Sequence, residues 1–193
     1  MQSLLPYDGE LFYVPGFLDD EQANVMHQHL LDELDWQAES IRIAGRFVPV
    51  PRLVAWYGTD GIVYTYSGTR HVAHGWQPLL LELREQVQAQ SGYRFNSVLA
   101  NQYRDGRDSM GWHADKEAEL GMNPCIASLS FGATRRFLLR HNRNKEIIEL
   151  NLENGSLLLM AGSLQHHWQH SVPKTSIAKG NRVNLTFRHI LTV

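Results

Sequence analysis

Apolar residues recur at helical spacing in a stretch near the start of the chain. Asp19 and Asp20 can cap the free amides of a helix start there. The apolar positions that follow, spaced as on one helix face, are Val25, Met26, Leu30, Leu31 and Leu34. A second helix is predicted to begin near Trp76 to Pro78, because proline suits the first turn, and to end at Gly92. We therefore expect two helices in the first half of the chain.

The remaining apolar residues fall in short runs that are rich in branched and aromatic side chains and bounded by Gly, Asn and Asp, as is typical of strands. These runs cover residues 95–103, 126–131, 137–140, 147–152, 156–160 and 183–190. Asn154-Gly155 lies between two runs and predicts a hairpin, and Lys179 to Asn181 predicts a loop. The pattern favours an α+β, mainly β fold: a double-stranded β-helix (jelly roll) of two packed sheets, flanked by the N-terminal helices.

The length of 193 residues and the hydrophobic content of 43% suit one domain with a sizeable core. We expect residues 1–93 to form an N-terminal extension with helices and hairpins, and residues 94–193 to form the jelly-roll core. A formal net charge of -2 argues against coating nucleic acid by bulk electrostatics, so any such contact must be local. Candidate basic clusters, which could equally be solvated surface, are Arg135, Arg136, Arg140, Arg143 and Lys145, and Arg42, Arg46 and Arg52.

The single cysteine, Cys125, lies in an apolar stretch and is expected to be a core thiol of a protein from a reducing compartment. Residues 1–8 have no basic start, apolar segment or cleavage site, so we expect no secretory leader. The chain also lacks a run of about 18 apolar residues, so we expect no membrane partner. These features predict a cytoplasmic protein, or a nuclear one if its source has a nucleus, and we expect a monomer.

Trp112-His113-Ala114-Asp115 offers an imidazole and a carboxylate that project to the same side if the backbone is extended. Iron(II) that must also bind a co-substrate and O2 needs three such ligands on one face of an octahedron. The third would come from His166, His167 or His170. In an extended segment His166 and His170 share a face and His167 lies on the other, so spacing does not select one. The alternative is that these histidines are hydrogen-bonded core or interface residues.

Residues 182–188 alternate completely, with Val183, Leu185 and Phe187 on one side and Arg182, Asn184, Thr186 and Arg188 on the other. Burying the apolar row leaves the polar row facing solvent or a polar pocket. Two arginines at this spacing suit carboxylates, with which their planar forks form bidentate contacts. Asn101 and Tyr103 repeat the spacing and could add donors. An exposed polar face is the alternative; together with the metal candidates, the row predicts an iron(II) oxygenase that uses 2-oxoglutarate.

Seven blocks of sequence agree in order, spacing and identity with one known family. They are Pro51–Gly58, Tyr64–Gly68, Asn101–Arg104, Trp112–Asp115, Ile126–Thr134, Trp168–Pro173 and Arg182–Arg188. On these blocks, which span most of the chain beyond Pro51, the sequence resembles the AlkB family of nucleic-acid dealkylating dioxygenases, especially its DNA and RNA repair homologues. The resemblance implies Fe(II), 2-oxoglutarate and O2 as cofactor and co-substrates.

The resemblance also implies residue roles. It makes His113, Asp115 and His170 the catalytic iron ligands, which selects His170 among the three histidines. The 2-oxoglutarate site it implies consists of Asn101, Tyr103, Arg182, Thr186 and Arg188, with Arg182 on the distal carboxylate and Arg188 near the 1-carboxylate.

The activity implied is oxidative dealkylation of bases such as 1-methyladenine and 3-methylcytosine in DNA, with release of formaldehyde, succinate and CO2. An alkylated base, flipped out of its stack, would lie between Tyr66 and His113, with Glu117 at its exocyclic edge. Tyr64 and Arg52, in the nucleotide-recognition region of the N-terminal extension, complete the implied substrate site.

One position departs from the pattern of duplex-acting members, which carry an aromatic wedge where this chain has Ala44. Alanine cannot fill the gap left by an extruded base, so single-stranded DNA is the expected substrate unless Phe47 or Ile43 takes that part. RNA is a possible partner. An RNA demethylase, a hydroxylase of another substrate on the same fold and a non-catalytic binding module remain alternatives.

Overall fold

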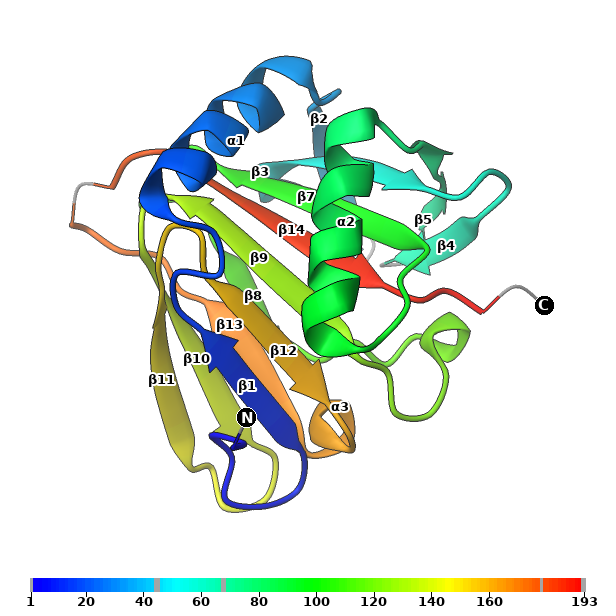
Figure 1. The fold of residues 1–193 in the computed structure, drawn as a ribbon. Coiled ribbons are helices and arrows are strands. Elements are labelled where there is room, and N and C mark those ends of the chain that lie inside the picture. Colours follow the sequence, from blue (N-terminus) through cyan, green and yellow to red (C-terminus); the bar gives the residue numbers. More distant parts are fainter. Residues whose placement is uncertain (1, 44–45, 67–68, 178, 192–193) are drawn as a thin grey trace.

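The computed structural model describes residues 2–43, 46–66, 69–177 and 179–191, and this part of the chain folds around two antiparallel sheets (Figure 1). The larger sheet has the order β1 (Glu10–Val14), β12 (Leu157–Ala161), β9 (Ile126–Gly132), β14 (Arg182–Arg188), β7 (Ser97–Tyr103), β3 (Arg46–Gly58) and β2 (Gln37–Ile43), with β6 (His74–Gly75) parallel to β3. The smaller sheet has the order β11 (Ile147–Leu152), β10 (Arg135–His141), β13 (Trp168–Val172) and β8 (Met110–His113). A separate hairpin consists of β4 (Val63–Tyr66) and β5 (Thr69–Val72).

Two helices cover the outer face of the larger sheet (Figure 1). Helix α1 (Asp20–Glu33) is capped by Asp19, whose side chain accepts a hydrogen bond from the backbone amide of Gln22 in a capping box. Helix α2 (Pro78–Ser91) has proline in its first turn and ends at Gly92 in the left-handed conformation. Both predicted helices and their end signals are confirmed. The two remaining helical segments are short: the 3-10 turn η1 (Ala118–Leu120) and α3 (Leu164–His167).

Strand alternation divides the interior into two cores. Val183, Leu185 and Phe187 of β14 point toward α1 and α2 and are fully buried there. The second core lies between the sheets, where Leu99 and Ile126 of the larger sheet meet Phe137 and Trp168 of the smaller one. The polar row of β14 faces this second space, so burial of the apolar row forces polar side chains between the sheets. The predicted mainly β, jelly-roll class is confirmed.

The N-terminal part of the chain also contributes strands to the larger sheet, since β1 pairs with β12 and β3 pairs with β7. The division between an extension and a core at residue 93 stays a prediction. Cys125 is buried in the helix-side core as expected, and burial raises the pKa of its thiol to about 12. No helix within the described residues has the length and apolar character needed to span a membrane.

The hairpin predicted at Asn154-Gly155 is wrong, because the strands on either side belong to different sheets. β11 is an edge strand with alternating exposure, whereas all five residues of β12 are buried between β1 and β9. Leu157, Leu159 and Ala161 of β12 pack in the helix-side core and Leu158 and Met160 pack in the core between the sheets, so both faces of β12 are covered. The turn therefore carries the chain from one sheet to the other. The loop predicted at Lys179 to Asn181 is confirmed.

The turn at Gly155 generates a prediction about stability. Gly155 has φ 69°, and a Cβ atom added to it would lie 2.3 Å from the carbonyl oxygen of Leu18. Gly16 also has a positive φ, 60°, but nothing lies within 4 Å of its added Cβ. Gly155→Ala should therefore lower the free energy of unfolding by at least about 1 kcal/mol more than Gly16→Ala, which suffers backbone strain alone. Urea denaturation of both variants measures the difference; equal losses would contradict the close approach.

Candidate active site

Two histidines and one aspartate meet where the smaller sheet faces β14. His113 ends β8 and pairs in register with His170 of β13, with their ring centroids 4.2 Å apart. Asp115 lies two residues beyond β8, and one ligand atom from each of the three residues lies within 4.8 Å of the others. The structure thus brings together the three side chains that the sequence proposes as metal ligands.

The segment with the three competing histidines is not extended throughout. Residues Leu164–His167 form the single turn α3, and only Trp168–Val172 is a strand. The condition under which His166 and His170 would share a face, an extended backbone from one to the other, is therefore not met. The helical turn directs His166 away, where its Nε2 contacts the carbonyl oxygen of Met122. The same turn buries Gln165, whose Oε1 accepts from the backbone amide of Asp115 at 2.9 Å.

Asp115 is a buried carboxylate held in its ionised form. Burial alone would raise its pKa, but the positive guanidinium of Arg188, followed by His170 and His113, outweighs burial and lowers the pKa to about 2. Oδ1 accepts a hydrogen bond from Arg188 at 3.1 Å. Oδ2 is buried and has no hydrogen-bond partner among the described residues. A buried carboxylate oxygen without a partner is costly, and a bound cation would satisfy it.

The two imidazoles are suited to ligate a metal. Burial, and then the neighbouring His113, lower the pKa of His170 to about 3, so His170 is neutral near pH 7. Nδ1 of His113 lies 2.9 Å from the carbonyl oxygen of Gly111, where it donates and leaves the lone pair on Nε2. Two neutral imidazoles and one carboxylate are the donor set of non-haem iron(II) oxygenases, so the residues present fit ferrous iron.

The polar row of β14 lines the same cavity as the three candidate ligands. In register, Arg182 pairs with Tyr103 of β7 and Asn184 pairs with Asn101. The cavity brings together all five residues that the sequence proposes for 2-oxoglutarate, namely Asn101, Tyr103, Arg182, Thr186 and Arg188. All five are buried. Sheet pairing therefore collects polar groups that lie up to 87 residues apart, from Asn101 to Arg188, into one slot.

Arg182 shows which kind of ligand the slot fits. Its side chain is almost completely buried, and Nη2 donates to the hydroxyl of Ser130 at 3.0 Å. Nε and Nη1 are buried and have no hydrogen-bond partner in the part of the chain that the structure describes, and the guanidinium lies over the ring of Tyr103. Burial lowers the pKa of Arg182 to about 10, which still leaves it charged near neutral pH. A buried guanidinium with two free donors matches a carboxylate oxygen pair.

Sequence reasoning missed three residues that shape the site. Ser128 lines the cavity, Ser130 accepts from Arg182, and Gln165 positions Asp115. The alternation of β9 carries a signal for the two serines, because its apolar residues Ala127 and Leu129 face the helices. Gln165 carries no sequence signal, because its role depends on the turn of α3.

The residues proposed for the substrate base are placed only in part. Arg52 is buried, donates from Nε to Asn101 Oδ1 at 2.8 Å, and lines a pocket that also contacts Trp112 and His113. Glu117 is partly buried, and its Oε2 has no hydrogen-bond partner among the described residues. Tyr64 and Tyr66 belong to β4, and their side chains lie outside the described part of the chain, as does Ala44.

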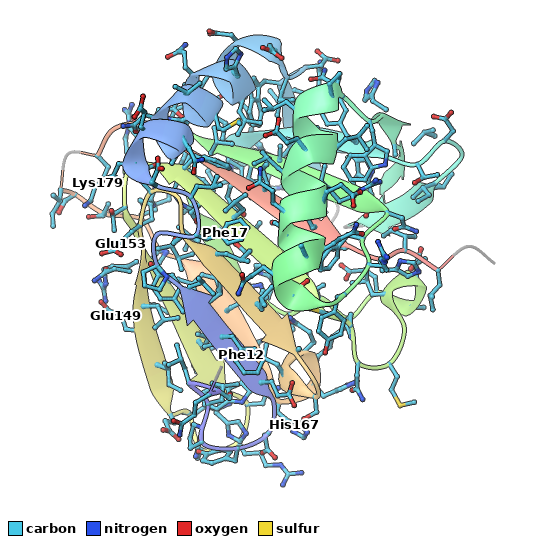
Figure 2. The ribbon with its side chains drawn as sticks, in the orientation of Figure 1. Phe12, Phe17, Glu149, Glu153, His167 and Lys179 are labelled. Carbon is cyan, nitrogen blue, oxygen red and sulfur yellow. The ribbon has the colours of Figure 1, made fainter. Side chains whose placement is uncertain are left out.

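The basic cluster that begins at Arg135 is not one uniform surface. Arg135 is buried and donates to the backbone oxygens of Asp105, Asp108 and Pro173, so it holds loops together and cannot reach a nucleic acid. Arg136 is paired with Glu149, which lies on the outer surface of β11 (Figure 2).

Arg140 lies in the same cluster but close to the candidate metal site. Its guanidinium carbon lies 4.4 Å from the ring centroid of Trp112, the neighbour of His113. Of these three arginines, Arg140 is therefore the one placed beside the metal motif.

Comparison with known proteins gives consistent results. The sequence model described as the 2OG-Fe(II) oxygenase superfamily matches residues 10–188. The rat protein "Alpha-ketoglutarate-dependent dioxygenase alkB homolog 3" is 40% identical over 186 residues, covering 91% of this chain and 62% of that protein. The mouse "DNA oxidative demethylase ALKBH2" is 42% identical over 181 residues, covering 88% of this chain and 76% of that protein. The chain thus spans less than two thirds of the length of the rat relative.

A solved structure, that of OsALKBH1, superposes with a TM-score of 0.65 and 18% sequence identity, covering 93% of this chain and 97% of that one. This similarity shows the fold alone.

The ion pair between Asp115 and Arg188 generates the second prediction. In metal-free protein near pH 7, Arg188→Met should lower the free energy of unfolding by about 3 kcal/mol, because it leaves a buried carboxylate without its partner. Arg136→Met removes an exposed pair and should leave the stability nearly unchanged. Denaturant unfolding in the presence of a chelator measures both. Equal effects of the two substitutions would show that Arg188 does not compensate Asp115.

Proposed function

This chain belongs to the AlkB family within the 2OG-Fe(II) oxygenase superfamily, and from this premise we propose that it removes alkyl groups oxidatively from the bases of DNA. The observation that carries the proposal is the convergence of His113, Asp115 and His170 beside a slot with two buried arginines. Such a site can hold a redox metal next to a small dianion. The names of the rat and mouse relatives support both the co-substrate and the DNA substrate.

In this proposal His113, Asp115 and His170 hold Fe(II). When bound, the metal and 2-oxoglutarate supply the oxidation of the alkyl carbon by O2, with formaldehyde, succinate and CO2 as products. The chain's own residues prepare the ligands. Arg188 keeps Asp115 ionised, and burial keeps His170 neutral, so both ligands are in their metal-binding forms near pH 7.

Arg182 would bind the distal carboxylate of 2-oxoglutarate through its two unpaired donors, and Arg188 would lie near the 1-carboxylate. Asn101, Tyr103 and Thr186 complete the slot. The hydroxyl of Thr186 donates to Asn184 Oδ1 at 3.0 Å, and the Asn184 amide donates to Ser128 and to the Leu129 carbonyl. These hydrogen bonds fix the side chains of the slot before the ligand arrives, which lowers the entropy cost of binding.

The base would stack between Tyr66 and His113, with Tyr64 and Arg52 as further contacts. N-alkylation at a pairing nitrogen makes the base cationic, and the unpaired Oε2 of Glu117 is a suitable counter-charge. After dealkylation the base is neutral, so the attraction ends and the product can leave. Through its hydrogen bond to Asn101, Arg52 connects this substrate side with the 2-oxoglutarate slot.

Single-stranded DNA is the substrate form that we propose, with the chain acting as a monomer. Extrusion of a base costs a few kcal/mol in a duplex and least in a strand that is already unpaired. Ala44 leaves the predicted wedge position without a side chain that could replace the extruded base.

The iron-ligand assignment is tested by comparing two histidines of one segment. His170→Ala should reduce 2-oxoglutarate-dependent succinate formation to the level of the metal-free protein, because it removes one of three ligands. His166→Ala is the matched control and should keep turnover, since His166 is exposed on α3. Succinate release is measured with Fe(II) and a methylated oligonucleotide. Full turnover by His170→Ala would remove His170 from the metal site.

The proposed strand preference is tested with 1-methyladenine and 3-methylcytosine in single-stranded and duplex oligonucleotides. Single strands should be repaired faster, and Ala44→Phe should raise the duplex rate relative to the single-strand rate, because it supplies a wedge. Formaldehyde release and mass spectrometry of the products measure both rates. Equal rates on both forms in the unmodified chain would contradict the proposal. A single-stranded RNA of the same sequence reports the DNA to RNA ratio.

A further inference from the structure

A second group of metal-binding side chains lies outside the candidate active site. Asp8 precedes β1, His141 is the last residue of β10, and His167 is the last residue of α3. Figure 1 shows that the N-terminal segment, the loop after β10 and α3 lie at the same end of the molecule, and Figure 2 labels His167 there. Three segments that are far apart in sequence thus place one aspartate and two histidines together.

The distances between these groups suit a single divalent cation. Oδ2 of Asp8 lies 3.1 Å from Nε2 of His141 and 4.0 Å from Nδ1 of His167. One ligand atom from each of the three lies within 4.8 Å of the others. In a tetrahedral site with metal–ligand bonds of about 2.0–2.2 Å, neighbouring ligand atoms are roughly 3.3–3.6 Å apart. The contact between Asp8 and His141 is already close to that spacing, whereas the contact between Asp8 and His167 must shorten on metal binding.

The hydrogen bonds around His141 favour the tautomer that presents a lone pair to Asp8. The amide of Asn144 is oriented by two contacts: its Oδ1 accepts from the Glu146 backbone amide at 3.1 Å, and its Nδ2 donates to the hydroxyl of Tyr7 at 2.6 Å. Asn144 Oδ1 therefore faces Nδ1 of His141 at 2.9 Å, a shorter contact than the 3.5 Å from the Asn144 backbone amide to the same Nδ1, so we assign the proton to Nδ1. In the neutral ring Nε2 is then an acceptor that faces the carboxylate of Asp8. Two acceptors at 3.1 Å repel each other unless a cation lies between them.

The surroundings hold these groups in place. His141 is almost fully buried and packs edge-on against Tyr7 and Trp168, with ring centroids 5.3 Å and 4.9 Å away. Asp8 has φ 58°, a left-handed conformation that aspartate adopts more readily than most non-glycine residues. The next residue, Gly9, presses so closely on α3 that an added Cβ would lie 2.6 Å from Cα of Leu164. This contact keeps Asp8 beside the helical turn that carries His167.

We propose that Asp8, His141 and His167 form a second metal site, for Zn²⁺ or a cation of similar ligand preference, with a fourth position open to solvent. Two imidazoles and one carboxylate are typical ligands of zinc, whose bonds to such donors are about 2.0–2.2 Å long. The side chains of Asp8 and His167 are 41% and 33% exposed, which gives the ion a path from solvent. The bound ion connects the N-terminal segment to α3, the turn that leads into the strand of His170.

The rival explanation for the short distance between His141 Nε2 and Asp8 Oδ2 is that His141 carries a proton on both ring nitrogens. The two residues would then form an ion pair. That ion pair requires no metal and predicts no zinc binding at this cluster. The two explanations are therefore separated by a metal titration.

The experiment uses the full chain with His113→Ala and Asp115→Ala, so that the candidate active site no longer competes for metal. Calorimetric titration with zinc chloride should give one equivalent bound, and Co²⁺ should give the visible absorption bands of four-coordinate cobalt. Adding Asp8→Asn to this background should weaken zinc binding by at least about tenfold, because one ligand is lost. Adding His166→Gln, a change in the neighbouring exposed histidine, should leave zinc binding unaltered.

Thermal unfolding provides a second measurement that detects misfolded variants. Zinc should raise the midpoint in the double-alanine background and should not raise it when Asp8→Asn is present, although both proteins unfold cooperatively without zinc. The unmodified chain should bind two zinc equivalents. If the unmodified chain and the double-alanine background each bind one equivalent, the second site is supported and the candidate active site does not bind zinc. No zinc bound in the double-alanine background, or full binding retained with Asp8→Asn, would overturn the second site.

Discussion

The buried ion pair between Asp115 and Arg188 is the interaction on which the candidate active site depends. Arg188 lies at the end of β14, near the middle of the larger sheet, and Asp115 follows β8 of the smaller sheet, so the pair connects the two sheets across the space between them. Burying two charges carries a desolvation cost that can exceed their mutual attraction at 3.1 Å. The compensation comes from the opposite face of β14, where Val183, Leu185 and Phe187 are fully buried under the helices.

The two faces of β14 therefore have opposite chemical character, one apolar and one polar. The helix-side face stabilises the fold, and the other face holds two guanidinium groups, an amide and a hydroxyl that are nearly inaccessible to solvent. The unpaired donors of Arg182 and the unpaired oxygen of Asp115 are costly for a protein without ligands. A cation at Asp115 and a dianion at Arg182 would remove both costs, so folding prepares the site for its two ligands in advance of their binding.

The cluster of Asp8, His141 and His167 obeys the same principle at the end of the molecule where α3 lies. There a buried imidazole faces a carboxylate, and the close packing of Gly9 against Leu164 keeps Asp8 beside α3. Neither cluster is visible as a sequence motif of three residues, because each combines segments that only the fold brings together. His113 and Asp115 were recognisable as a pair, whereas Asp8 is 133 residues from its partner His141.

The sequence by itself determined the two helices, the strand runs, the polar row of residues 182–188 and the pair His113 and Asp115, because helical and strand periodicity are local and decide which side chains share a face. Residue spacing left His166, His167 and His170 equivalent, and the tertiary structure places His170 beside His113 and Asp115, since the turn of α3 interrupts the strand period. It also decided that Asn154-Gly155 joins two sheets and that Arg135 is buried. These features depend on which strands become neighbours, and neighbours are chosen by the burial of whole faces across distant parts of the chain.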